Sequence, residues 1–196
     1  KIPIVIGGGH NNAYGNIKGA ALGLHQLGKI KSPKINVLNI DAHADFRALE
    51  GRHSGNGFSY AMSDGYLHKY AIIGLHQNYM PQSMLDAIRK NKNIQIHFFE
   101  DIFVSQKITQ EQATEMSLYF TRSTYTGIEI DLDAIENVLS SAVSPIGFRT
   151  DIARQFIHQT ALKSKVAYLH ICEGATELDT GLKSSSTGKL ISYLVS

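Results

Sequence analysis

The sequence predicts an α/β fold of three layers, α/β/α, with a central and mostly parallel sheet. Short runs rich in β-branched residues alternate along the chain with longer stretches of helical periodicity. Apolar strands that are joined through helices of this length imply right-handed crossover connections. Such crossovers make the strands parallel and cover both faces of the sheet with helices.

Strands and helices are expected to follow one another along the whole chain. The strands are predicted at residues 2–6 (IPIVI), 35–41 (INVLNID), 69–75 (KYAIIGL), 94–99 (IQIHFF), 126–132 (TGIEIDL) and 165–171 (KVAYLHI). The helices are predicted at residues 13–27, 82–90, 110–120, 151–163 and 187–195. In the first helix the apolar side chains recur on one face, as expected of a helix that packs on a sheet.

Length and composition indicate one globular domain and exclude several kinds of partner. The chain has 196 residues, of which 43% are hydrophobic, enough for one sizeable core. The formal net charge is only +2 and no basic stripe is visible, so we expect neither nucleic acid nor a membrane surface as a partner. A single cysteine, Cys172, cannot form an internal disulfide, which indicates a reducing compartment and hence the cytoplasm.

Several predicted strands end in polar residues. Ligands of an open parallel sheet bind beyond the carboxyl ends of its strands. The polar ends are GGGH (7–10) after the first strand, DAHAD (41–45) after the second, DLD (131–133) after the fifth and HICE (170–173) after the sixth. Because residues two apart on a strand share a face, Asp41 should point with His43, and Asp131 with Asp133.

The acidic residues at these strand ends need positive charge. They are Asp41, Asp45, Asp131 and Asp133. At separations of about 5 Å and an effective dielectric near 20, each pair of carboxylates repels by roughly 3 kcal/mol. Two divalent cations would balance four such charges, and paired catalytic metals lie roughly 3.5–4 Å apart. The sequence therefore predicts a binuclear metal site.

The residue types at this site also favour one kind of metal. Four carboxylates with the imidazoles of His10 and His43 form an oxygen-rich set without thiolate, which favours Mn²⁺ over the nitrogen and sulfur sites typical of Zn²⁺. Iron, cobalt or nickel could substitute. A water molecule between two such ions loses its proton near neutral pH and becomes a nucleophile, so hydrolysis is the implied reaction.

The motifs GGGH, DAHAD and EIDLDAIE, in this order, resemble those of the ureohydrolases: arginase, agmatinase and formimidoylglutamase. These are binuclear manganese hydrolases with an arginase-like fold that cleave a C–N bond of a guanidino or formimidoyl group. The resemblance covers nearly the whole chain. It implies two manganese ions, one held by His10, Asp41, Asp45 and Asp131, the other by Asp41, His43, Asp131 and Asp133. It also makes Glu173 the acid that faces the cationic amidine or guanidinium carbon.

Departures from the family pattern bear on the substrate. Arginase has Asn where this chain has Arg47; an arginine is similar to the formimidoylglutamases, whose substrate carries a further carboxylate that a guanidinium could bind. Alternatively, Arg47 pairs with Glu50 on the surface. The segment RHSGNGFSYA (52–61) resembles the family's substrate loop, which makes Ser54 and Asn56 candidate substrate-binding residues. Phe58 replaces the proton-shuttling histidine of arginase, and this disfavours guanidine cleavage.

The resemblance thus implies hydrolysis of N-formimidoyl-L-glutamate to glutamate and formamide, a step of histidine degradation. Glu173 would stabilise the positive charge on the substrate nitrogen, and Asp133 would help manage the proton of the tetrahedral intermediate. Two alternatives stay open: an arginase- or agmatinase-type hydrolase that releases urea, and a catalytically silent metal-binding scaffold. Because the ligand positions are intact, the enzyme is favoured.

The remaining expectations concern the extent of the chain and the end of its last strand. Ureohydrolases are generally longer, and this chain enters an apolar segment directly at Lys1. We therefore expect residues 1–196 to be a single arginase-like catalytic domain that lacks an N-terminal segment, within a homo-oligomer as is usual in the family. His170 either orients the strand end beside the metals or is plain structure. Cys172 is expected to be a small buried thiol.

Overall fold

The computed structural model describes residues 1–196 and contains one six-stranded sheet in the order β1-β6-β5-β2-β3-β4. All neighbouring strands are parallel. The strands are β1 (Ile4–Ile6), β2 (Ile35–Ile40), β3 (Leu67–Leu75), β4 (Ile94–Phe98), β5 (Thr126–Asp131) and β6 (Val166–Cys172). Each predicted strand is present, with small shifts at its ends, and the predicted parallel sheet is confirmed.

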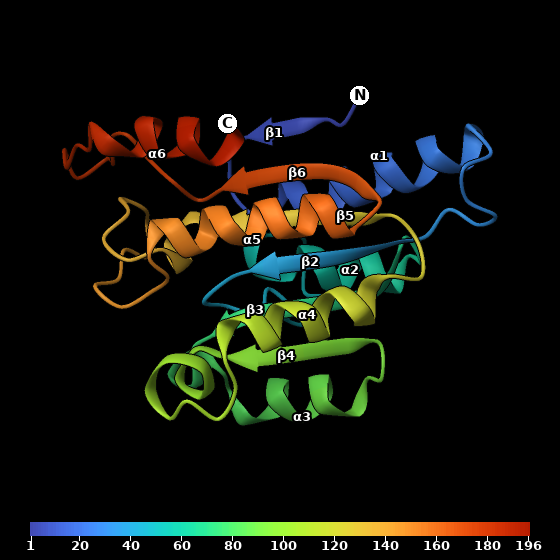
Figure 1. Cartoon of the computed structure of the whole chain (residues 1–196), viewed down its shortest axis with the longest axis horizontal. Helices are drawn as coiled ribbons and strands as arrows, with labels where there is room; N and C mark the ends of the chain where they lie inside the picture. Colours follow the sequence, from blue (N-terminus) through green and yellow to red (C-terminus); the bar gives the residue numbers. More distant parts are fainter.

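Helices cover both faces of this sheet. They are α1 (Asn12–Gln26), α2 (Gly57–Ser63), α3 (Gln82–Lys90), α4 (Gln110–Thr121), α5 (Thr150–Lys163) and α6 (Ser186–Val195). Figure 1 shows α4 and α5 lying across one face. The hydrophobic core on that side includes residues of α4, α5 and α6, whereas the other core includes residues of α1, α2 and α3. The three predicted layers are therefore confirmed. No helix combines the length and apolar character that a bilayer crossing requires.

The strand β2 illustrates why the apolar runs form the middle of the sheet. Every residue of β2 is buried. Leu38 and Ile40 belong to the core under α4 and α5, while Ile35 and Val37 belong to the core under α1 and α2. Because side chains alternate between the faces, only a run that is apolar at nearly every position can lie between two helical layers.

Several short helical segments were not predicted from the sequence. Among them are α2 and a π-helix at Glu100–Val104. Each is too short to show helical periodicity, and α2 begins at Gly57. Tertiary packing holds α2 in place, since Phe58 stacks on the Tyr70 ring of β3 at a centroid distance of 4.3 Å and both rings are fully buried. The segment 52–61, predicted as a loop, is therefore partly helical.

A close approach of two elements requires a glycine in β3. Gly74 has φ of +99°, a left-handed conformation that L side chains rarely adopt. It lies where the pairing register between β3 and β4 shifts. A Cβ atom at this position would overlap the ring of Phe148, which is fully buried.

We predict that Gly74→Ala destabilises the protein by about 2–4 kcal/mol, because it combines overpacking against Phe148 with a strained φ. The free energy of unfolding in urea would measure this. Gly19→Ala is the matched control, since Gly19 is exposed in the middle of α1 with open space around it. That change should stabilise by about 0.5–1 kcal/mol. Equal effects of the two substitutions would contradict the packing argument.

Candidate metal centre

A glycine turn carries His10 to the carboxyl edge of the sheet. Gly7 and Gly8, which follow β1, have φ values of +90° and +74°. The turn is tied to the end of β6 by main-chain hydrogen bonds, from Gly7 N–H to Ile171 O at 2.8 Å and from Glu173 N–H to Gly8 O at 3.0 Å. His10 emerges fully buried, just before α1 begins. The GGGH segment is thus a strand-to-helix turn that orients one imidazole.

Asp41 and His43 lie beyond the end of β2, in a turn. Asp41 Oδ1 accepts a hydrogen bond from the main-chain N–H of His43 at 2.7 Å, and Asp41 Oδ2 accepts one from Asn39 Nδ2 at 2.9 Å. The strand ends at Ile40, so the prediction that it reaches residue 41 was wrong. The turn, rather than strand alternation, places Asp41 and His43 together. Asp45 follows with φ of +44°.

Asp131 and Asp133 meet in the same way at the end of β5. Asp131 is the last residue of the strand, and a 3₁₀ turn, Leu132–Ala134, follows it. Asp131 Oδ1 accepts a hydrogen bond from Asp133 N–H at 2.9 Å. In both motifs a carboxylate oxygen binds the amide two residues on, which is the Asx turn typical of aspartate. The predicted strand 126–132 was therefore too long at its end.

The structure brings together all six side chains that the sequence predicted as metal ligands. The Nδ1 atom of His10 lies 3.2 Å from Asp41 Oδ2, 2.9 Å from Asp45 Oδ2 and 3.1 Å from Asp131 Oδ2. The potential ligand atoms of these four residues all lie within 4.8 Å of one another.

A second group of potential ligands consists of Asp41, His43 and Asp133, again within 4.8 Å of one another. His43 Nδ1 lies 3.3 Å from Asp133 Oδ2. The two groups share Asp41, which suits a carboxylate that bridges two ions. Asp131 belongs to the first group only, and its predicted sharing between both ions stays a prediction.

Burial and mutual repulsion favour the protonated forms of Asp41 and Asp131 when no metal is bound. Burial, followed by the charge of Asp45, raises the pKa of Asp41 to about 7. Burial, followed by the charge of Asp41, also raises the pKa of Asp131 well above its usual value. Protons thus reduce the negative charge of these carboxylates, as a bound cation would.

Neighbouring carboxylates raise the pKa of the two imidazoles. A hydrogen bond to Asp133 is the main cause that raises the pKa of His43 to about 9. Burial acts to lower the pKa of His10, but Cys172 and the hydrogen-bonding carboxylates around the ring outweigh it, so this pKa lies well above 6.5. Both groups of potential ligands therefore favour the binding of positive charge.

Unpartnered buried atoms indicate that these residues fit divalent cations. Asp133 Oδ1 is buried and lacks a hydrogen-bond partner, and His10 Nδ1 is buried among carboxylate oxygens of Asp41, Asp45 and Asp131 at 2.9–3.2 Å. Such atoms cost free energy unless something binds them. Four carboxylates and two imidazoles form an oxygen-rich donor set of the kind that Mn²⁺ and similar ions prefer. Both groups of ligands are therefore suited to hold an ion.

Glu173, the predicted substrate-facing acid, lies at the end of β6 beside this centre. Its Oε1 accepts a hydrogen bond from the main-chain N–H of His10 at 2.7 Å. Its φ is +59°, so both Glu173 and Asp45 are non-glycine residues in the left-handed region. Backbone strain of this kind persists where the surrounding structure enforces it, and it gathers at functional sites.

A cavity of about 1090 Å³ opens beside the metal centre. Its lining includes His43, Asp133 and Glu173 together with Arg47 and Ser54. This volume is ample for a small metabolite. Four of the six predicted metal ligands, the predicted acid and two predicted substrate-binding residues thus face one space.

Arg47 is exposed and pairs with Glu50 at the edge of this cavity. The distance from Arg47 Nη2 to Glu50 Oε1 is 2.9 Å, and His53 Nε2 lies 3.2 Å from the same oxygen. His53 Nδ1 accepts a hydrogen bond from Gly55 N–H at 3.1 Å, so this imidazole serves as a cap for the short turn at Ser54–Asn56. The pairing of Arg47 with Glu50, expected as the alternative, is present.

Asn56 is fully buried and its amide group is bound by the main chain. Its Oδ1 accepts a hydrogen bond from His53 N–H at 3.0 Å, and its Nδ2 donates to Ala48 O at 3.1 Å and to Gly51 O at 2.8 Å. It does not line the cavity. Asn56 therefore shapes the loop that carries Arg47 and Ser54. Its predicted contact with substrate stays a prediction.

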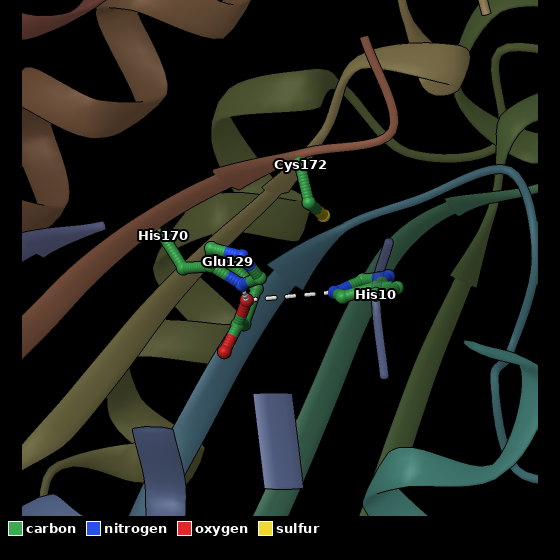
Figure 2. Close-up of side chains that lie close together, drawn as sticks. All are labelled: His10, Glu129, His170 and Cys172. Atoms are coloured by element: carbon green, nitrogen blue, oxygen red, sulfur yellow. Dashed lines mark hydrogen bonds and ion pairs between the residues drawn. The ribbon is translucent and has the colours of Figure 1, made fainter. Parts of the chain in front are cut away.

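Glu129, a fully buried carboxylate in β5, was not among the residues predicted for the site. Its Oε1 accepts a hydrogen bond from the hydroxyl of Tyr168 at 2.6 Å, and its Oε2 lies 2.5 Å from Nδ1 of His170. Burial alone would raise its pKa, but hydrogen bonds from His10 and His170 lower it to about 2. His170 thus contacts this acid, as Figure 2 shows. The signal was available, because Glu129 shares the strand face of Asp131.

The fold and this centre define a class: α/β proteins with a carboxylate-rich site for divalent cations at the carboxyl edge of a parallel sheet. Within that class, the family model described as "Arginase family" matches residues 1–195, and the chain belongs to this family. It is 29% identical over 178 residues to a formimidoylglutamase of Streptococcus pyogenes serotype M3, a match that covers 87% of this chain and 53% of that protein. The chain thus spans about half the length of the curated relatives it matches.

Solved structures support the same fold. A formimidoylglutamase from Bacillus subtilis superposes with a TM-score of 0.77 at 20% identity, covering 99% of this chain and 58% of that one. A Trypanosoma cruzi formiminoglutamase with Mn²⁺ gives 0.78 at 17% identity, covering 99% and 63%. An arginase from Bacillus cereus gives 0.73 at 21% identity, covering 100% and 69%. At these identities the likeness concerns the fold.

We predict that the metal-free protein loses stability as the pH rises from 6 to 9. The pKa of Asp41 rises from 3.8 to about 7 on folding, and that of His43 from 6.5 to about 9. A group with a raised pKa contributes stability below its unfolded value and loses it as the pH rises through the folded value. Both groups therefore act in the same direction within this window.

Thermal unfolding of chelator-treated protein would measure this, with and without Mn²⁺. The Tm without metal should fall across the window, and the increase of Tm on adding Mn²⁺ should grow, since metal binding needs deprotonated ligands. Asp41→Asn removes one titrating group and should flatten the fall. A metal-free Tm that stayed level or rose between pH 6 and 9 would contradict the prediction.

Proposed function

We propose that this chain is the catalytic domain of a formimidoylglutamase-type hydrolase. The reaction would cleave the C–N bond of N-formimidoyl-L-glutamate and release glutamate and formamide. The observation that carries the proposal is one cavity whose lining includes Glu173, Arg47 and four of the six predicted metal ligands, namely His43, Asp45, Asp131 and Asp133. The names of the relatives from Streptococcus pyogenes support the same substrate.

Two Mn²⁺ ions per chain are the proposed cofactors. His10, Asp41, Asp45 and Asp131 would hold one ion, and Asp41, His43, Asp131 and Asp133 the other. The oxygen-rich donor set supports manganese, as does the Mn²⁺ named with the Trypanosoma cruzi structure. When bound, such a pair supplies Lewis acidity and makes water acidic enough to act as a nucleophile near neutral pH.

The protein's own residues would bind the substrate and move its proton. Glu173 carries a carboxylate that accepts the main-chain N–H of His10, and this contact directs it along the cavity wall where a cationic amidine nitrogen would lie. Asp133 has a buried Oδ1 without a hydrogen-bond partner. This oxygen would accept the proton of the tetrahedral intermediate and return it to the leaving nitrogen. Phe58 is fully buried against His10 and carries no proton.

Arg47 would bind the carboxylate that distinguishes this substrate from guanidino compounds. An exposed guanidinium presents donors in a fork that matches a carboxylate. In this structure the fork is paired with Glu50. A substrate carboxylate would therefore replace the Glu50 carboxylate on Arg47, with Ser54 beside it in the cavity lining.

The pairing of Arg47 with Glu50 is also the observation that favours the alternative. If the pair persists, the positive charge of Arg47 is neutralised, and the cavity suits a guanidino substrate that releases urea. A small-molecule substrate is common to both proposals. We further propose a homo-oligomer, as is usual in the family, and the cytoplasm, since the chain has a single cysteine and that thiol is buried.

We predict formamide as the product when the Mn²⁺-loaded protein is incubated with N-formimidoyl-L-glutamate, and no urea from arginine or agmatine. Assays for formamide, urea and ammonia with each of these three compounds would distinguish the proposed function from its alternatives. Asp131→Asn is the control and should abolish turnover, because Asp131 is a proposed ligand. Urea from a guanidino compound would favour the alternative. Two bound Mn²⁺ without any product would favour the silent scaffold.

We predict that Arg47→Ala raises KM for N-formimidoyl-L-glutamate by about 10- to 100-fold with kcat little changed, because charged hydrogen bonds contribute about 1.5–3 kcal/mol. Glu50→Gln should lower KM, since it frees Arg47. Arg52→Ala is the matched control: Arg52 lies over the Tyr14 ring and does not line this cavity. Steady-state kinetics would measure all three. An unchanged KM in Arg47→Ala would exclude the carboxylate role.

A further inference from the structure

A cluster of buried polar side chains lies beneath the metal centre, on the side away from the cavity. It comprises Glu129, Tyr168, His170 and His10, shown except for Tyr168 in Figure 2. The hydroxyl of Tyr168 donates to Oε1 of Glu129 at 2.6 Å. Nδ1 of His170 lies 2.5 Å from Oε2, and Nε2 of His10 lies 3.5 Å from the same oxygen. The two oxygens of Glu129 thus face three donors.

The ring of His10 has two edges with different surroundings. Nδ1 faces the carboxylates of Asp41, Asp45 and Asp131 within 3.2 Å. Nε2 lies 3.5 Å from Oε2 of Glu129 and has no hydrogen-bond partner at a shorter distance. An imidazole binds a cation through the nitrogen that lacks a proton, so the other nitrogen must carry it. That N–H is buried and requires an acceptor, which Glu129 supplies.

The surroundings of Glu129 are fitted to hold this acceptor in place. A buried carboxylate is costly unless hydrogen bonds compensate it. Tyr168 reaches it by lying over Gly127, two residues earlier on the same strand. A Cβ atom at Gly127 would come within 2.5 Å of the Tyr168 ring. The glycine in β5 therefore makes room for the phenol that orients Glu129.

We propose that Glu129 is a positioning residue for His10. Its carboxylate, held from the other side by Tyr168 and His170, selects the tautomer of His10 with the proton on Nε2. Nδ1 is then free to bind a divalent cation together with Asp41, Asp45 and Asp131. This inference rests on the proposed function, because it concerns the same metal centre, and it adds a residue outside the predicted ligand set.

The same cluster could instead hold an ion of its own. The potential ligand atoms of His10, Glu129, His170 and Cys172 lie within 4.8 Å of one another. However, both oxygens of Glu129 already accept hydrogen bonds, and a contact of 2.5 Å to His170 leaves no room for an ion between them. The thiol of Cys172 is directed to Ile130 O at 3.7 Å. The contacts therefore favour a hydrogen-bonded support over a third metal site.

The test is a calorimetric titration of the metal-free full chain with Mn²⁺, compared between the wild type and Glu129→Gln. Glutamine keeps the size of the side chain but presents an amide where one donor needs an acceptor. We expect two equivalents of Mn²⁺ in both proteins and an affinity about 10- to 100-fold weaker for one of them in Glu129→Gln. Tyr168→Phe is the matched control, since it leaves Glu129 next to His10, and it should cause a smaller loss.

A second measurement does not depend on the variant being folded. Nitrogen-15 NMR of the imidazoles in the Zn²⁺-loaded wild type, with His10→Asn for assignment, reports which nitrogen carries the proton. A proton on Nε2 of His10 supports the proposal, and a proton on Nδ1 overturns it. Unchanged Mn²⁺ affinity in a folded Glu129→Gln variant also overturns it, as does a third Mn²⁺ equivalent that Glu129→Gln removes. If the wild type binds no Mn²⁺, the proposed function fails as well.

Discussion

The need to compensate four carboxylates in one enclosed place governs this structure. Asp41 and Asp131 are almost completely buried, and Asp45 and Asp133 stand beside them at the carboxyl edge of the sheet. Without cations, burial and repulsion raise the pKa of Asp41 and Asp131, and the neighbouring carboxylates raise the pKa of His10 and His43. An arrangement of this kind persists in a fold only if it binds positive charge. The mutual repulsion of the carboxylates therefore favours the binding of cations at this site.

The surrounding structure supplies rigidity where the site demands unfavourable conformations. Asp45 and Glu173 hold left-handed backbone conformations that most residues avoid. They follow strands that are buried on both faces, so the main chain before them has little freedom to relax. Asp41 and Asp131 each accept a hydrogen bond from the amide two residues on, and these turns aim the remaining carboxylate oxygens inward. The apolar layers thus do more than stabilise the fold, because they hold charged groups at distances that repulsion alone would increase.

Acidic and basic side chains alternate through the site. The carboxylates of the metal centre face His10, and His10 faces Glu129, which in turn binds His170. At the cavity edge the guanidinium of Arg47 meets Glu50, and Glu50 meets His53. Each of these side chains compensates the charge of its neighbour, so a substitution of one should change the electrostatic environment of the next. A cationic amidine with a carboxylate tail would fit into this alternation, with its positive end near Glu173 and its negative end at Arg47.

Local patterns in the sequence predicted much of the fold and of the site, because β-branched apolar runs and polar strand ends depend only on neighbouring residues. They determined the strands, the parallel layered fold and the six predicted metal ligands that gather at one edge of the sheet. The short helix α2 and the loop role of Asn56 depended on partners remote in the chain, and so did the contacts of Glu129 with Tyr168 and His170. The order β1-β6-β5-β2 was likewise decided by long-range pairing. Only that order makes residues 10, 41, 131 and 173 neighbours in space, since spacing along the chain sets the direction of a side chain but not which strand lies beside it.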